Sequence, residues 1–178
     1  MKRGVVEVWT DGSGTRSGPV GWAAILRFVD GEGEVHEREV VGSGDEGTNN
    51  VAELLAVIDG LEALRRPCNV LVVTDSEYVM FGFAPCDGQP GGRVERWKRR
   101  GWMTNGKPRK EVANRVLWES LDAAVSRHLT VSWRHVEGHT GIEMNERADR
   151  LAGDARRRAK EQLEARQLTD AEAAELAA

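Results

Sequence analysis

The spacing of apolar residues divides the first part of the chain into three strands followed by a helix. Short runs rich in β-branched and apolar side chains are separated by Gly- and Asp-containing turns, which predicts an antiparallel meander. The period then changes to 3.6 residues, which predicts a helix capped by Asn49 or Asn50. The three strands are expected at residues 5–9, 21–29 and 35–42, and the helix at residues 50–64.

A continuously apolar run follows from Val70 to Val73 and ends in Thr74 and Asp75. Such a run is typical of a strand buried on both faces, and therefore of a central strand with parallel neighbours. The resulting element order, β-β-β-α-β-α-α-α-β-α, predicts an α/β fold in which helices flank a mixed sheet. Further helices are expected at residues 76–81, within 93–101, at 111–127 and at 144–152, and the last strand at 129–133.

Four carboxylates lie at positions from which the predicted elements would direct them toward one common region of the fold. Asp11 follows the first strand, Glu53 lies in the first turn of the first helix, and Asp75 ends the central strand. Asp149 lies on the last helix, four residues after Asn145 and therefore on the same face. Each acid has an ordinary alternative, namely a turn former, a helix-dipole charge, a helix N-cap and a solvated surface charge. Sites form at the carboxyl ends of strands in open α/β sheets, which favours a shared site.

Composition limits the class of protein. The 178 residues suffice for one domain with its own core, and no apolar run approaches the roughly 20 residues of a membrane span. Cys68 and Cys86 form no CxxC pair, which favours a reducing compartment and predicts a cytoplasmic protein.

The charge distribution along the chain is uneven. The formal net charge is −4, but residues 93–115 hold nine Lys or Arg residues and two Glu, a local charge of +7. A basic island on an acidic body is typical of a site for a polyanion. Trp97 and Trp102 lie inside this island, where they either stack against nucleic acid or anchor the segment to the body.

The chain changes character after residue 155. A basic stretch is followed by a segment dominated by Ala, Glu and Leu. The last helix either extends or gives way to a short separate helix with Thr169 and Glu172 as its capping box. Because no firm apolar stripe is present, residues 156–178 are expected to form a loosely held helical extension or a disordered tail outside a domain of residues 1–155.

Five short motifs occur in order along these elements. They are Asp-Gly-Ser at 11–13, Asn-Asn-x-x-Glu at 49–53, Thr-Asp-Ser at 74–76, Trp-Lys-x-x-Gly-Trp at 97–102, and Gly-His-x-Gly with Asn-Glu-x-x-Asp at 138–149. Together they resemble type I ribonuclease H over about residues 5–155. Each motif alone is weak, but five in this order, each on the element type it needs, are specific. The resemblance implies the ribonuclease H-like fold, with a five-stranded mixed sheet and a basic handle helix.

The resemblance also implies roles for individual residues. Asp11, Glu53, Asp75 and Asp149 would be the catalytic acids and the metal ligands, and His139 the histidine of a mobile loop beside them. Residues 93–115 would form the handle, a protrusion that grips the DNA strand. The residues implied in substrate binding are Ser13, Thr48, Asn49, Asn145, Trp97, Lys98, Arg99, Arg100 and Trp102.

The implied chemistry suits these residue types. Hydrolysis of a phosphodiester needs charge stabilisation at the attacking and leaving oxygens, which two Mg²⁺ ions held by carboxylates provide, with Mn²⁺ as an alternative. The expected activity is cleavage of the RNA strand of an RNA–DNA hybrid by a monomer, leaving 5′-phosphate and 3′-hydroxyl ends. Two other hypotheses stay open: a DNA nuclease or resolvase of the same fold, and a hybrid-binding module without catalysis.

Two stretches depart from the family pattern. The turn after Asp11 lacks the Asn of the Asn-Pro-Gly that many relatives carry, so Arg16 or Ser17 takes its place or that contact is lost. The loop at residues 82–92 is longer than in compact relatives. An aromatic residue that usually precedes the handle is missing or is replaced by Phe81 or Phe83.

Overall fold

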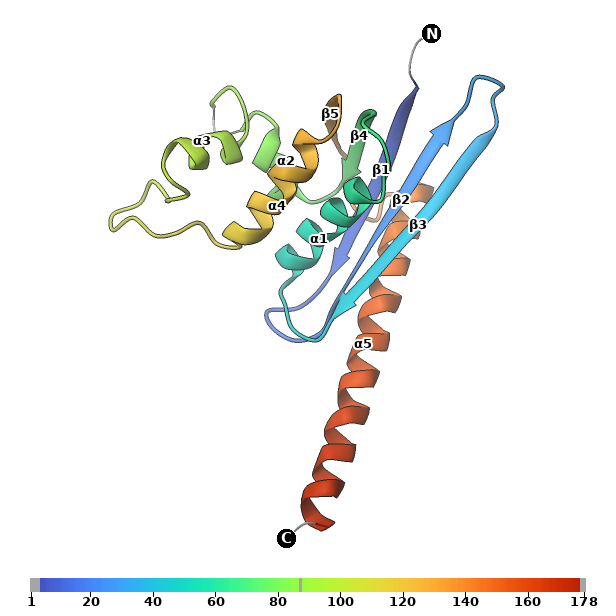
Figure 1. Cartoon of the computed structure of the whole chain (residues 1–178), viewed down its shortest axis with the longest axis vertical. Helices are drawn as coiled ribbons and strands as arrows, with labels where there is room; N and C mark the ends of the chain where they lie inside the picture. Colours follow the sequence, from blue (N-terminus) through green and yellow to red (C-terminus); the bar gives the residue numbers. More distant parts are fainter. Residues whose placement is uncertain (1–3, 87, 177–178) are drawn as a thin grey trace.

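Five strands form a single mixed sheet in the computed structural model, which describes residues 4–86 and 88–176 (Figure 1). The spatial order is β3-β2-β1-β4-β5. The first three strands pair antiparallel, and β4 lies parallel to both β1 and β5. This arrangement confirms the predicted mixed sheet. The strands are β1 (Val5–Ser13), β2 (Val20–Val29), β3 (Val35–Gly44), β4 (Asn69–Thr74) and β5 (Thr130–His135).

Helices cover both faces of the sheet. One face carries α1 and α4, and the other carries α5, which packs against the first three strands (Figure 1). The connection from β4 to α4 holds the two short helices α2 and α3. The helices are α1 (Asn49–Glu62), α2 (Glu77–Phe83), α3 (Arg93–Arg99), α4 (Arg115–Ser126) and α5 (Glu143–Leu176).

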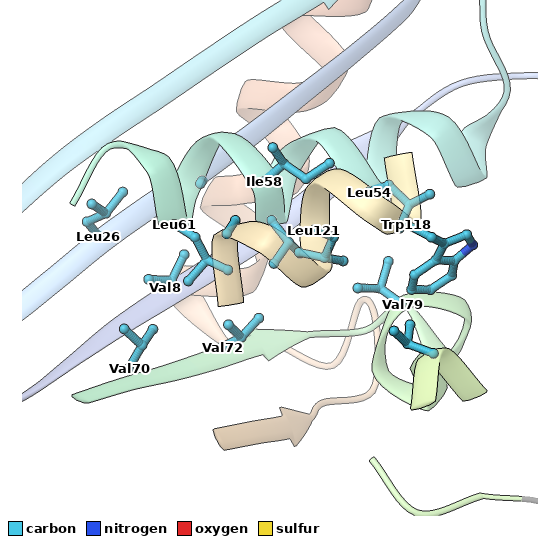
Figure 2. Close-up of a cluster of buried hydrophobic side chains, with 14 of the residues drawn as sticks. Val8, Leu26, Leu54, Ile58, Leu61, Val70, Val72, Val79, Trp118 and Leu121 are labelled. Carbon is cyan, nitrogen blue, oxygen red and sulfur yellow. The ribbon is translucent and has the colours of Figure 1, made fainter. Parts of the chain in front are cut away.

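Alternation along the strands supplies a core on each side of the sheet. In β1, Val8 points into the cluster shared with α1 and α4, whereas the next residue, Trp9, packs toward α5. Figure 2 shows the larger cluster, in which side chains from α1 and α4, among them Trp118 of α4, pack against Val8, Val70 and Val72 of the strands. Burial of this kind stabilises by roughly 25 cal/mol per Å² of apolar surface, so the two cores fix the elements that bear the acids.

Helix α5 lies directly against the backbone of β2. A Cβ atom at Gly21 would stand 2.3 Å from the carbonyl oxygen of Ala152 and from the backbone nitrogen of Arg156. Only glycine therefore allows the helix to approach the sheet this closely at that point.

Several boundaries differ from the predictions. Strand β1 continues to Ser13, so Asp11 lies inside the strand, opposite Ala23, rather than in a turn after it. The N-cap of α1 is Thr48 and neither asparagine, because its Oγ1 accepts the hydrogen bond from the Val51 amide.

Helix α4 begins later than predicted, at Arg115. The preceding Asn114 has a positive φ of 58°, and Glu111 forms a β-bridge with Met103. Residues 111–114 are therefore part of the connection and not of the helix.

Helix α5 is much longer than predicted and continues without a break past the end of the sheet (Figure 1). The capping box was wrong, because Thr169 Oγ1 donates to the Ala165 carbonyl inside the helix instead of starting a new one. The division into a domain and a tail stays a prediction, and its residues 1–3 and 177–178, like residue 87 of the predicted loop, lie outside the described residues. Among the described helices, none combines the length and apolar character needed to cross a membrane.

Candidate active site

Three of the four predicted acids meet at one end of the sheet. Asp11 comes from β1, Glu53 from α1, and Asp75 from the end of β4. Each offers a carboxylate oxygen, and these oxygens all lie within 4.8 Å of one another. Asp11 and Glu53 are almost fully buried, with 6% and 5% exposure. The alternative that Asp75 is a helix N-cap is excluded, since Ser76 caps α2.

Gly12 allows β1 and α1 to approach closely enough for this meeting. A Cβ atom there would lie 2.3 Å from the backbone nitrogen of Glu53. The strand and the first turns of the helix are thus in backbone contact at Gly12. The carboxylates of Asp11 and Glu53 share the buried space beside it.

The fourth acid, Asp149, borders the cluster from α5. Its side chain is 45% exposed, and its charge helps to raise the pKa of Asp11. His139 lies in the loop between β5 and α5 with a positive φ of 56°. The His139 side chain is 83% exposed, and its Nδ1 stands 3.9 Å from Asp149 Oδ2.

Burial and mutual repulsion disfavour the charged forms of the inner acids. Burial is the largest cause that raises the pKa of Asp11 to about 8, followed by the charges of Asp75 and Asp149. Burial likewise raises the pKa of Glu53 well above its ordinary value, with the charges of Asp11 and Asp75 adding to it. Hydrogen bonds from Asn49 and the Gly12 backbone only partly oppose that rise.

The side chain of Asn145 is buried and contacts Asp75. Its Nδ2 donates to Asp75 Oδ2 at 3.2 Å, and the residue is only 2% exposed. The nucleic-acid contact that the resemblance implies for Asn145 stays a prediction, and in this structure the amide is buried against Asp75. Among the described residues, its Oδ1 is buried without a hydrogen-bond partner.

Asn49 links the acids to the β1–β2 connection. Its Oδ1 accepts from the Gly14 amide at 2.9 Å, and its Nδ2 donates to Glu53 Oε1 at 3.3 Å. Asn49 is exposed at the start of α1, next to the capping Thr48. Ser13 is partly buried at the end of β1, where it pairs with Gly21.

The basic island forms α3 and the irregular segment after it. Lys98 donates from Nζ to Asp122 Oδ2 at 2.6 Å, which ties α3 to α4. Arg99 and Arg100 are exposed, and Arg99 forms a long ion pair with Glu95, at 3.9 Å.

The two tryptophans of the island face the body of the protein. Trp102 is buried, and its ring lies 6.5 Å from that of Trp97, which in turn packs edge-on against Trp118 of the core. Of the two interpretations, the structure supports the one in which tryptophans anchor the segment. The contact of Trp102 with nucleic acid stays a prediction, and in this structure its ring has little free surface.

Comparison with known proteins identifies the family. The sequence pattern of the RNase H family matches residues 3–157. The chain belongs to the ribonuclease H family. It is 49% identical over 145 residues to "Ribonuclease H" of Ruegeria sp. (strain TM1040), covering 81% of this chain and 86% of that protein. It is 48% identical over 152 residues to "Ribonuclease H" of Halorhodospira halophila (strain DSM 244 / SL1), covering 85% and 92%.

Solved ribonuclease H structures share the fold. LC9-RNase H1, described as a type 1 RNase H with the type 2 active-site motif, superposes with a TM-score of 0.74 at 30% identity, covering 88% of this chain and 74% of that one. The N-terminal RNase H domain of rv2228c from Mycobacterium tuberculosis gives a TM-score of 0.61 at 25% identity, covering 90% and 99%. The predicted type I ribonuclease H is confirmed, and with it the assignment as a nuclease.

The acids of this ribonuclease H fit a divalent cation. Oε2 of Glu53 is buried with no hydrogen-bond partner among the described residues, although a buried carboxylate oxygen needs a proton, a donor or a metal. Oxygen atoms from three carboxylates in one small space form the donor set that Mg²⁺ and Mn²⁺ prefer.

The sequence did not reveal the residues that shape the site but are not themselves proposed to bind metal or substrate. Gly12 was interpreted as a turn glycine, although a glycine inside a strand also indicates close backbone approach. A Cβ atom at Gly138 would lie 2.9 Å from Asp75 Oδ2, and His135 Nε2 lies 3.0 Å from the Asp75 carbonyl oxygen. No local signal predicts the last two contacts, because they join residues about 60 positions apart.

Proposed function

We propose that this ribonuclease H is an endonuclease that hydrolyses the RNA strand of RNA–DNA hybrids and leaves 5′-phosphate and 3′-hydroxyl ends. The observation that carries the proposal is the convergence of Asp11, Glu53 and Asp75 in a chain of this family. Curated relatives with 46–49% identity bear the name Ribonuclease H, which supports the same substrate class for this chain.

Asp11, Glu53, Asp75 and Asp149 would hold two Mg²⁺ ions, which supply Lewis-acid stabilisation of the attacking and leaving oxygens when bound. The contribution of the protein itself is to position these carboxylates. Asn145 fixes the orientation of the Asp75 carboxylate, and Asn49 fixes one oxygen of Glu53.

His139 is proposed to exchange a proton at the edge of the site. Its imidazole is largely exposed and lies beside Asp149, so it can reach both solvent and a bound phosphodiester. Histidine is the side chain that most often transfers protons in general acid–base catalysis.

Substrate recognition is proposed to use two surfaces on either side of the acids. Backbone amides near Ser13, with Thr48 and the side chain of Asn49, would read the 2′-hydroxyls of the RNA strand. The exposed Arg99 and Arg100 of the handle would bind phosphates of the DNA strand, and Lys98 would contribute once released from Asp122.

The test uses a hybrid with a labelled RNA strand and two controls of equal sequence, duplex DNA and duplex RNA. We expect Mg²⁺-dependent cleavage of the hybrid alone, abolished by chelator and by Asp75→Asn, with RNA products that carry a 5′-phosphate. Preferential cleavage of duplex DNA would instead support the DNA-nuclease hypothesis. Tight hybrid binding without cleavage would support the binding-module hypothesis.

A further inference from the structure

The distal part of α5, residues 156–176, lies almost wholly beyond the residues matched by the family pattern, which end at 157. It leaves the sheet beside two loops, the β1–β2 loop at residues 14–19 and the β3–α1 loop at residues 45–48 (Figure 1). Both loops lead directly into the proposed substrate-binding residues.

Distal α5 contacts both loops with specific side chains. Arg166 Nη2 donates to Asp45 Oδ1 at 2.7 Å, across 121 positions of sequence. Arg156 Nε donates to the Pro19 carbonyl at 3.2 Å. Between these polar contacts, Leu163 and Gln167 line one hollow together with residues of the two loops, namely Ser17, Gly18, Asp45 and Glu46.

The two loops are also bonded to each other, so one support acts on both. The Gly47 amide donates to the Gly18 carbonyl at 2.9 Å, and the Asn49 amide donates to the Thr15 carbonyl at 3.3 Å. The side chain of Asn49 completes the connection by accepting from the Gly14 amide and donating to Glu53. A continuous series of contacts therefore runs from Arg166 to one of the acids.

We infer that distal α5 is a brace that holds the two substrate-binding loops in their binding conformation. The inference rests on the proposed function, because it assumes that residues near Ser13 and Asn49 contact the hybrid. Exposed loops are mobile unless something restrains them, and ordering them beforehand removes part of the entropy cost of binding. In this arrangement Arg166 is a positioning residue and touches neither the acids nor the substrate.

The experiment compares Arg166→Ala with Lys160→Ala in the full chain. Lys160 is a matched control, because it loses an ion pair of similar exposure, to Glu164 at 3.7 Å, that stays within α5. We expect amide hydrogen exchange at residues 15–18 and 45–49 to become about two- to fivefold faster in Arg166→Ala only, as befits a surface ion pair. The KM for the hybrid should rise by a similar factor of about two to five, with kcat unchanged.

A charge swap separates bracing from a general loss of stability. Arg166→Asp combined with Asp45→Arg restores the ion pair, and we expect it to return loop exchange and KM to within about twofold of the parent. Equal exchange rates in Arg166→Ala and Lys160→Ala would overturn the brace. Faster loop exchange with an unchanged KM would overturn the link between the braced loops and substrate. Faster loop exchange in a protein that cleaves no hybrid would support the brace and refute the proposed function.

Discussion

Asp75 is held from three directions. Asn145 donates to its carboxylate, His135 contacts its backbone carbonyl, and Gly138 lies against its side chain. Residues that orient a metal ligand typically matter almost as much as the ligand.

Replacing Asn145 with Ala should therefore lower the apparent Mg²⁺ affinity or the activity by about 10- to 100-fold, because the Asp75 carboxylate loses its orienting donor. Cleavage rates across a Mg²⁺ titration measure the effect. The melting temperature in chelator shows whether the variant remains folded. Activity and Mg²⁺ dependence equal to those of the parent would show that Asn145 does not position Asp75.

The raised pKa of Asp11 predicts how stability depends on pH in the absence of metal. The folded protein keeps this proton up to a pKa of about 8, whereas the unfolded chain loses it near 3.8. The folded state thus binds more protons between these values, so the free energy of unfolding should fall as pH rises through this window.

Melting temperatures in chelator across that window test this expectation. Asp11→Asn should flatten the decline, because the amide has no proton to lose. Saturating Mg²⁺ should flatten it as well, since a bound cation offsets the buried charge. A melting temperature that rises from pH 5 to pH 8 in chelator would contradict the raised pKa.

At the scale of elements, local pattern was sufficient for the order and type of every strand and helix. The 3.6-residue period persists through α1, and the continuous apolar run of β4 supplies side chains to the cores on both faces of the sheet. The exact ends were less predictable, since the start of α4 depends on Asn114 and on a bridge between Met103 and Glu111. Such contacts come from tertiary structure, which no local pattern contains.

In the site, too, some features were predictable from local sequence pattern and others were not. The acids were predictable because each lies on or directly after a recognisable element, and their convergence follows from the topology of the sheet. The burial of Asn145 and Trp102 was not predictable, because a polar or aromatic residue in a motif has the same sequence signature whether it faces solvent or core.

The exposed arginines of α3 and of the residue after it predict how the affinity for the hybrid depends on salt concentration. Arg99→Ala with Arg100→Ala should weaken hybrid binding, and the slope of log affinity against log salt should fall by about one per lost phosphate contact. Binding measured over a range of salt concentrations gives this slope. Arg65→Ala with Arg66→Ala is the matched control, an exposed pair after α1 at the far end of the sheet. Equal slopes for the two double variants would remove α3 from the binding surface.

For the whole molecule, the acids come from four elements, so a cation that binds them links parts far apart in sequence. Mg²⁺ at 100 times its dissociation constant should stabilise the fold by about 2.7 kcal/mol. That corresponds to a rise in melting temperature of about 5–10 °C for a chain of this size.

Asp75→Asn should lose most of this rise, and Asp170→Asn, an exposed acid near the end of α5, should keep it. Thermal melts with and without Mg²⁺ make the comparison. The same rise in all three proteins would place the stabilising cation elsewhere.

The absence of a side chain at Gly21 has a consequence for the reach of the fourth acid. At this point α5 rests on bare strand backbone, and Asp149 lies less than one turn before Ala152, which makes that contact. A Cβ atom added at Gly21 would force α5 away from β2 at this point, so we expect Gly21→Ala to displace Asp149 relative to the other three acids. The absence of a side chain at Gly21 thereby contributes to the distance between Asp149 and the three acids carried by the other elements.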